Sequence, residues 1–179
     1  MRERVIEIRP DDHVSGSPNA PVTLVEYGDY ECPHCGAAFP IVENIRRRLG
    51  DRLQFVYRHF PLTQSHPHAE HAAEIAEAAG ERGAFWAMHE TLFANQRALD
   101  DVSLVAYAQS VGVDPQWAAE ALAAGTFAPR VREQFMSGVR NGVNGTPTFF
   151  INGRRFDYSL NERVLLATLE DAALANTSN

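Results

Sequence analysis

The sequence contains no lysine: all 16 basic residues are arginine, and 23 acidic residues leave a formal net charge of -7 over 179 residues. The longest run of positive charge is the arginine triplet at 46–48. Because nucleic-acid phosphates are bound by clustered basic side chains, this pattern disfavours broad nucleic-acid binding. Uninterrupted apolar runs are also short, well below the roughly 18 residues that span a bilayer, so we expect no membrane-spanning segment.

The N-terminal segment lacks the apolar stretch of a secretory signal, because residues 1–12 are rich in charge. We therefore expect a cytoplasmic protein, with an exported form whose signal has been removed as the alternative. With 45% hydrophobic residues, the chain can bury one core, and it is too short for two ordinary domains.

Cysteine is scarce as well, since Cys32 and Cys35 are the only two. A disulfide between them closes so small a ring that it adds only about 2 kcal/mol before strain. A structural zinc site needs four ligands, and no second Cys-x-x-Cys motif exists. We therefore expect no bound metal and a chemical use for the pair. The turn before Cys32 and the proline after it indicate an exposed helix start.

Hydrophobic periodicity places this pair between a strand and a helix. Residues 22–27 are β-branched and apolar, which is typical of a strand buried on both faces. Apolar side chains recur at helical spacing from 33 to 49, and Gly50 suits a helix C-cap. A second strand follows at 53–57, which predicts a right-handed βαβ unit with parallel strands.

The remaining segments complete an α/β pattern. An edge strand is expected at 4–8, followed by a turn-rich stretch at 11–21. Residues 67–138 carry several helix signals and no convincing strand. Residues 148–156 predict a hairpin, and the capping-box pattern at 159–162 predicts the start of a last helix. The expected order is βαβ, a helical insertion, and ββα.

The position of Cys32 at a helix start favours its thiolate, because unbonded N–H groups and the helix dipole stabilise a negative charge there. In Cys-x-x-Cys motifs the pKa of the first thiol falls from ~8.5 to between ~3.5 and ~7.5. Cys35, one helical turn later, can attack a mixed disulfide formed on Cys32. Pro33 suits the first helical position, and a protonated His34 would add positive charge beside the thiolate.

Four segments together resemble the DsbA-like branch of the thioredoxin superfamily. They are Cys-Pro-His-Cys at 32–35, Gly-Thr-Pro-Thr-Phe-Phe at 145–150, and the stretches at 57–62 and 85–89. The resemblance covers nearly the whole chain and implies an α/β, thioredoxin-like fold, with a central mixed sheet flanked by helices and an inserted all-helical domain.

This resemblance also implies a division of the chain. Residues 12–60 and 143–175 would form the two parts of the thioredoxin-like domain, and residues 61–142 would form the helical insertion. The implied activity is dithiol-disulfide exchange, which needs no cofactor other than the redox-active Cys32–Cys35 pair.

The resemblance further assigns roles near the cysteines. Pro147 would be a cis proline that lies against them and aligns a substrate chain, and Thr146 would contact the substrate or the sulfurs. Glu26 matches an acidic residue beneath the second cysteine, where burial raises its pKa and lets it exchange protons with Cys35. The alternatives are a polar strand-edge role for Thr146, and a solvent-facing or arginine-paired Glu26.

The function expected first is a protein disulfide oxidoreductase. Its partners would be thiol- or disulfide-containing proteins, together with a redox partner protein or a small thiol. One alternative is a glutathione-transferase-like or isomerase-like enzyme that uses a small thiol on the same fold; Cys35 argues against it, because such relatives usually lack the second cysteine. Another is an interaction module in which the dithiol is incidental.

A histidine cluster is the other candidate site. His66, His68 and His71 lie close together in the sequence and could suggest a metal. A cluster at a helix entry, without metal, is the interpretation that we favour. Phe85, Met88 and their helical neighbours are interpreted as core residues.

Overall fold

A five-stranded sheet, in the order β1-β3-β2-β4-β5, runs through the centre of the computed structural model, which describes residues 5–178. Its strands are β1 (His13–Gly16), β2 (Val22–Gly28), β3 (Leu53–His59), β4 (Thr148–Ile151) and β5 (Arg154–Arg155). β2 and β3 are parallel, and every other neighbouring pair is antiparallel. The α/β fold with a central mixed sheet, as predicted from the sequence, is therefore confirmed.

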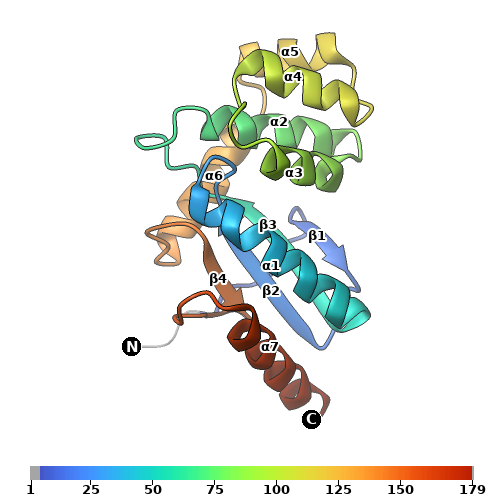
Figure 1. Ribbon diagram of the computed structural model, residues 1–179, viewed down its shortest axis with the longest axis vertical. Helices are drawn as coiled ribbons and strands as arrows, with labels where there is room; N and C mark the ends of the chain where they lie inside the picture. The colour runs from blue at the N-terminus through green and yellow to red at the C-terminus, as the bar shows by residue number, and fades with distance from the viewer. Residues whose placement is uncertain (1–4, 179) are drawn as a thin grey trace.

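Helices cover this sheet and also form a separate stack (Figure 1). The helices are α1 (Pro33–Leu49), α2 (Ala69–Glu81), α3 (Phe85–Ala94), α4 (Asp101–Ser110), α5 (Pro115–Ala124), α6 (Ala128–Arg140) and α7 (Glu162–Thr177), with a short 3-10 turn, η1 (Gly50–Arg52), after α1. α2 to α6 all lie between β3 and β4 in the chain. Figure 1 shows α2 to α5 gathered beyond one end of the sheet, whereas α1 and α7 lie along it. Across residues 5–178, no helix has the length and apolar character that crossing a bilayer requires.

The two faces of the sheet are covered differently. Side chains of successive strand residues point to opposite faces. On β2, Val22 and Leu24 pack in the core that contains α1 and α7, whereas Val25 and Tyr27 pack on the other face with Phe135 of α6. By the same alternation, Glu26 points toward α1.

The N-terminal edge of the sheet differs from the sequence expectation. Residues 5–9 form no strand, and Arg4 lies outside the described residues. The edge strand is instead β1, which lies within the stretch expected to be turns and pairs antiparallel with β3. Ile6 is buried and its N–H donates to the carbonyl of Gly153 at 2.9 Å. This bond to the turn between β4 and β5, and one from Arg58 to the carbonyl of Glu7 at 2.7 Å, hold the segment without building a ladder, which explains why an apolar pattern there produced a wrong prediction.

The helix ends follow local chemistry closely. Gly50 ends α1 with a φ of 52°, and Gly125 ends α5 in the left-handed conformation, as a C-terminal glycine allows. The predicted capping box at Ser159 is wrong, because α7 begins two residues later. Asn161 caps it, and its side chain accepts hydrogen bonds from the N–H groups of Arg163 and Val164.

A buried carboxylate joins the helical stack to the sheet. Glu77 of α2 is 3% exposed, and it accepts hydrogen bonds from His13 of β1 (2.9 Å), His59 of β3 (2.8 Å) and Arg130 of α6 (2.6 Å). Burial alone would raise the pKa of Glu77, but the hydrogen bonds from both histidines and their attraction hold it well below its ordinary value. Four elements are therefore tied to one negative charge.

We expect Glu77→Gln to lower the free energy of unfolding by about 3 kcal/mol at pH 7, because it leaves the partly buried guanidinium of Arg130 without its anion and weakens the hydrogen bonds from His13 and His59. A carboxylate with a lowered pKa stabilises the fold above its unfolded value of ~4.3, and this stability is lost as pH falls below it. Urea unfolding at several pH values should show the difference from the unsubstituted protein shrinking in acid. Glu81→Gln, at the exposed end of the same helix, is the matched control; a difference that is constant with pH would contradict the prediction.

Candidate active site

The turn that leads from β2 into α1 places the two cysteines. Cys32 is the N-cap of α1, and Pro33 occupies the first helical position, where a missing N–H costs nothing. The N–H of Cys32 donates to the carbonyl of Asp29 at 3.2 Å, and the N–H of Gly36 donates to the carbonyl of Cys32 at 3.0 Å. Both cysteines are free thiols.

Exposure separates the four residues of the motif. Pro33 and His34 are exposed, whereas Cys32 is 3% exposed and Cys35 is fully buried. The expected exposed helix start therefore holds for the two central residues and is wrong for Cys32 itself. Its thiol donates to the carbonyl of Thr146 at 3.6 Å, so the loop before β4 lies directly against it.

The first thiol is strongly acidic. The pKa of Cys32 is lowered to about 5, first because the side chain of Cys35 donates a hydrogen bond to its thiolate. Burial opposes this change, and donation from the side chain of Thr146 and from the backbone N–H groups of Cys35 and His34 adds to it. In the thiol form the buried hydroxyl of Thr146 has no hydrogen-bond partner, which leaves it free to donate to the thiolate.

The second thiol has the opposite character. Burial raises the pKa of Cys35 well above its ordinary value, and the hydrogen bond to Cys32 and repulsion from Glu26 add to the effect. At neutral pH the pair therefore consists of one thiolate, on Cys32, and one thiol, on Cys35. That is the protonation state in which the first sulfur is the nucleophile and leaving group, and the second must lose a proton before it can attack.

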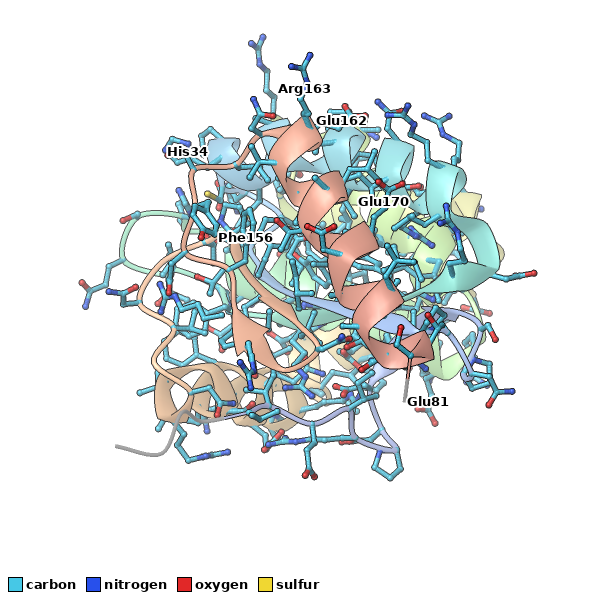
Figure 2. All side chains as sticks on the ribbon, turned by 90° about the horizontal axis from the view of Figure 1, so that it is seen from below. His34, Glu81, Phe156, Glu162, Arg163 and Glu170 are labelled. Atoms are coloured by element: carbon cyan, nitrogen blue, oxygen red, sulfur yellow. The ribbon has the colours of Figure 1, made fainter. Side chains whose placement is uncertain are left out.

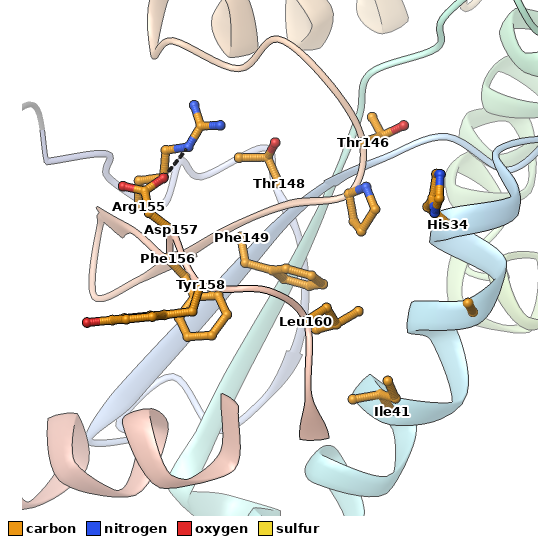
Figure 3. A pocket seen from close by; sticks show the side chains of 12 residues that line it. His34, Ile41, Thr146, Thr148, Phe149, Arg155, Phe156, Asp157, Tyr158 and Leu160 are labelled. Atoms are coloured by element: carbon orange, nitrogen blue, oxygen red, sulfur yellow. Dashed lines mark ion pairs between the residues drawn. The ribbon is translucent and has the colours of Figure 1, made fainter. Parts of the chain in front are cut away.

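The loop before β4 completes the thiol site. The peptide bond between Thr146 and Pro147 is cis. Both residues line a cavity of about 520 Å³ that runs from the start of α1 to the segment after β5. Figure 3 shows His34 on one wall of this cavity, with Phe149 and Leu160 below Thr146.

The far end of this cavity is aromatic. Phe156 and Tyr158 are 5.4 Å apart between ring centroids, and Tyr158 is 70% exposed. Arg155 and Asp157 form an ion pair of 2.9 Å at the rim (Figure 3). In Figure 2, His34 and Phe156 lie on the same side of α7. The cavity therefore has an apolar floor. One end lies beside the start of α1, which carries the cysteines, and the charged pair Arg155–Asp157 lies at the other end.

Glu26 lies beneath the cysteines on the α1 side of the sheet. It is 3% exposed, pairs in register with Tyr57 on β3 and Phe149 on β4, and its Oε1 has no hydrogen-bond partner. Burial raises the pKa of Glu26 to about 8, with repulsion from Glu43 and Cys32 as smaller causes. The solvent-facing alternative for Glu26 is therefore wrong.

The three histidines of the loop and α2 have separate partners. Nδ1 of His66 lies 2.8 Å from Oδ2 of Asp29, and Nδ1 of His71 lies 2.6 Å from Oδ1 of Asp101. The backbone N–H of His68 donates to Glu31 at 2.7 Å. Among residues 5–178, no group of three or more histidine, cysteine or acidic side chains is arranged to hold a metal ion.

Two side chains near the cysteines were not predicted from the sequence. Gln96, in the turn after α3, donates to the carbonyls of Tyr30 and Cys32. Asp29 is 2% exposed and accepts hydrogen bonds from the N–H groups of Glu31 (2.8 Å) and Leu62 (2.9 Å). An aspartate just before a helix could have indicated a turn. For Gln96 no local pattern exists, because its contacts are more than 60 residues away in the chain.

Comparison with known proteins fits this site. A family model described as thioredoxin matches residues 9–171. The crystal structure of oxidised BdbD from Bacillus subtilis is 25% identical, with a TM-score of 0.83 over 96% of this chain and 99% of that one. The thiol-disulfide exchange protein α-DsbA2 from Wolbachia pipientis has a TM-score of 0.76 at 19% identity, over 90% of this chain and 87% of that one, and shows the shared fold.

Curated relatives carry a different name. A segment of the Na(+)/H(+) antiporter NhaA 1 of Salinispora arenicola is 45% identical over 94% of this chain, and one of the antiporter NhaA of Herminiimonas arsenicoxydans is 38% identical over 89%. This chain spans about a quarter of the length of these relatives, namely 26% and 25%. The family match covers most of the chain and the fold is that of the DsbA-type structures. The chain therefore belongs to the thioredoxin family.

Proposed function

We propose that the chain is a thiol-disulfide oxidoreductase that exchanges disulfides with protein substrates. The observation that carries this proposal is the contrast between the two sulfurs, with the pKa of Cys32 at about 5 and that of Cys35 raised by burial. A pair of cysteines with a purely structural role would not need two such different pKa values. The likeness to BdbD and the thioredoxin family match support the same activity.

In the oxidising direction, a substrate thiolate attacks Cys32 Sγ of the Cys32–Cys35 disulfide. A substrate–Cys32 disulfide forms, the bond between the two cysteines breaks, and Cys35 leaves with the electron pair and takes up a proton. A second substrate thiolate then attacks the substrate sulfur of the mixed disulfide, and Cys32 leaves as a stable thiolate. A leaving thiol of low pKa speeds this last step.

In the reverse direction Cys35 is the attacking group and needs its proton removed. Glu26, with a pKa raised to about 8, lies on the sheet beneath it and is the proton acceptor that we propose. When Cys35 displaces the substrate from Cys32, its proton passes to the carboxylate of Glu26. The substrate leaves as a thiolate, and the Cys32–Cys35 disulfide forms.

The cavity beside Pro147 is the proposed substrate site. Its apolar floor suits an extended peptide with an aliphatic or aromatic side chain next to its cysteine, and Thr146 lies where that peptide would meet Cys32. His34 forms a wall of the cavity, which places it beside the substrate. In this proposal Thr146 and Pro147 orient the partner chain.

The acidity of Cys32 favours the oxidising direction. An unfolded cysteine ionises near ~8.5, and Cys32 ionises at about 5 in the fold. The native reduced form therefore gains stability as pH rises from about 5 toward ~8.5, and loses it as pH falls. Since the disulfide form gains nothing of the kind, reduction is favoured and the disulfide is an oxidant.

A second candidate concerns the partner. The curated relatives are antiporters in which a segment like this chain makes up about a quarter of the length. We infer that a sodium–proton antiporter is one partner of this chain. Cys35→Ser should trap its partners as mixed disulfides in cells of the source organism. Antiporter peptides among the trapped chains would support this candidate; traps that contain only other proteins would remove it and leave the exchange activity standing.

We expect Cys32→Ser to abolish both insulin reduction and oxidative refolding of a reduced protein, because the remaining thiol, Cys35, is fully buried and stays protonated. Cys35→Ser should instead accumulate the mixed disulfide, which non-reducing electrophoresis detects. If Cys32→Ser kept the activity of the unsubstituted protein, the dithiol would be incidental.

The titration of Cys32 should have its midpoint near pH 5, measured as the rate of alkylation by iodoacetamide. Cys35→Ala should raise this midpoint, because it removes the hydrogen bond that is the largest cause of the lowered pKa. A midpoint near ~8.5 in the unsubstituted protein would remove the argument for an oxidant.

Resolution of a preformed Cys32 mixed disulfide should accelerate as pH rises through about 8, because Glu26 accepts a proton only when ionised. We expect Glu26→Gln to lower the rate of mixed-disulfide resolution by up to about tenfold and to remove this pH dependence. Glu43→Gln should move the profile to lower pH, since repulsion from Glu43 contributes to the raised pKa. Identical resolution profiles in Glu26→Gln and the unsubstituted protein would make Glu26 structural.

A further inference from the structure

A side chain from the helical stack donates hydrogen bonds to the backbone of the turn that carries Cys32. Gln96 lies in the turn after α3, and its Nε2 donates to the carbonyl of Tyr30 at 2.8 Å and to the carbonyl of Cys32 at 2.9 Å. Both N–H bonds of one amide are thus directed at the backbone on either side of Glu31. No other side chain in residues 5–178 donates to either carbonyl at hydrogen-bond distance.

The first turn of α1 makes room for this amide. Gly36 follows Cys35, and a Cβ added there would overlap Oε1 of Gln96 and lie 2.7 Å from its Cδ. The same glycine donates its N–H to the carbonyl of Cys32 at 3.0 Å. The carbonyl of Cys32 therefore accepts two hydrogen bonds, one from its own helix and one from Gln96.

The remainder of this turn is fixed by segments that precede α2. The carboxylate of Asp29 accepts from the N–H of Leu62 at 2.9 Å and contacts His66 at 2.8 Å, and the carboxylate of Glu31 accepts from the N–H of His68 at 2.7 Å. Those contacts hold the turn from one side. Gln96 is the contact that reaches the backbone of Cys32 itself.

We propose that Gln96 is a positioning residue for Cys32 and contributes to the stability of its thiolate, an inference that rests on the proposed function. Its amide holds the carbonyls of Tyr30 and Cys32 and so fixes the backbone whose N–H groups face the sulfur. Donation to a carbonyl also offsets the negative end of that dipole, which lies next to the developing thiolate. The helical stack thereby sets the acidity of a cysteine that belongs to the sheet domain.

The test is the titration of Cys32 in two variants of similar side-chain size, followed by thiolate absorbance in the ultraviolet. Gln96→Met removes both donors and should lower the ratio of thiolate to thiol about threefold or more at a fixed pH below the midpoint. Gln96→Glu removes the donors and adds a negative charge, so its loss should be about tenfold or more. Asn95→Ala is the control, because the adjacent Asn95 donates to Thr91 within its own helix.

A second route reaches the same contact from the other side. Gly36→Ala should displace the amide of Gln96 while favouring the helix, and should lower the thiolate ratio as Gln96→Met does. In the Gln96→Ala background the extra methyl meets no amide, so Gly36→Ala should then have no further effect. This non-additivity is specific to the proposed contact.

Equal Cys32 titrations in Gln96→Met, Gln96→Glu and the unsubstituted protein would overturn the proposal. Additive effects of Gly36→Ala and Gln96→Ala would overturn it too. If a Gln96 variant fails to fold, which circular dichroism reveals, the Gly36→Ala titration decides the matter. An unsubstituted protein that catalyses neither insulin reduction nor oxidative refolding but shows these shifts would contradict the proposed function and leave the role of Gln96 intact.

Discussion

The hydrogen bond that the Cys35 thiol donates to the Cys32 thiolate is the interaction on which this molecule's chemistry depends. The side chain of Thr146, in the loop before β4, supplies a second donor. The backbone N–H groups of Cys35 and His34, which have no acceptors within the helix, add smaller contributions. Because those donors come from separate segments of the chain, the acidity of Cys32 depends on correct assembly of the whole fold.

Burial gives the ionisable groups near the cysteines different pKa values, and so different roles. Cys35 and Glu26 both lie on the covered side of the sheet, where desolvation raises both pKa values and keeps both protonated at neutral pH. Cys32, at the rim of the same core, is the one that ionises first. An incoming substrate therefore meets a single defined nucleophile, and Cys35 stays protonated until Glu26 ionises and can accept its proton.

Local patterns in the sequence predicted much of this arrangement. The strand at β2, the helix start at Cys32 and the glycine at its end each follow from neighbouring residues, and so does the acidity expected for Cys32. Asn161 was missed because two capping patterns overlap within three residues. β1, the Glu77 cluster and Gln96 were missed for another reason: each depends on residues far apart in the chain, such as Glu77 with His13. The roles of Thr146 and Pro147 stay predictions drawn from the family, and the role of His34 stays a prediction drawn from the charge of its imidazole.

The position of the helical segment within the chain has a consequence for biogenesis. Register pairing joins Leu24 of β2 to Ile151 of β4, so the loop that brings Thr146 to Cys32 can dock only after α2 to α6 have been made. Pairing across so long a separation is slow relative to local helix formation. On a ribosome, the nascent chain would carry the cysteine pair without its partner loop until residues 146–151 have emerged.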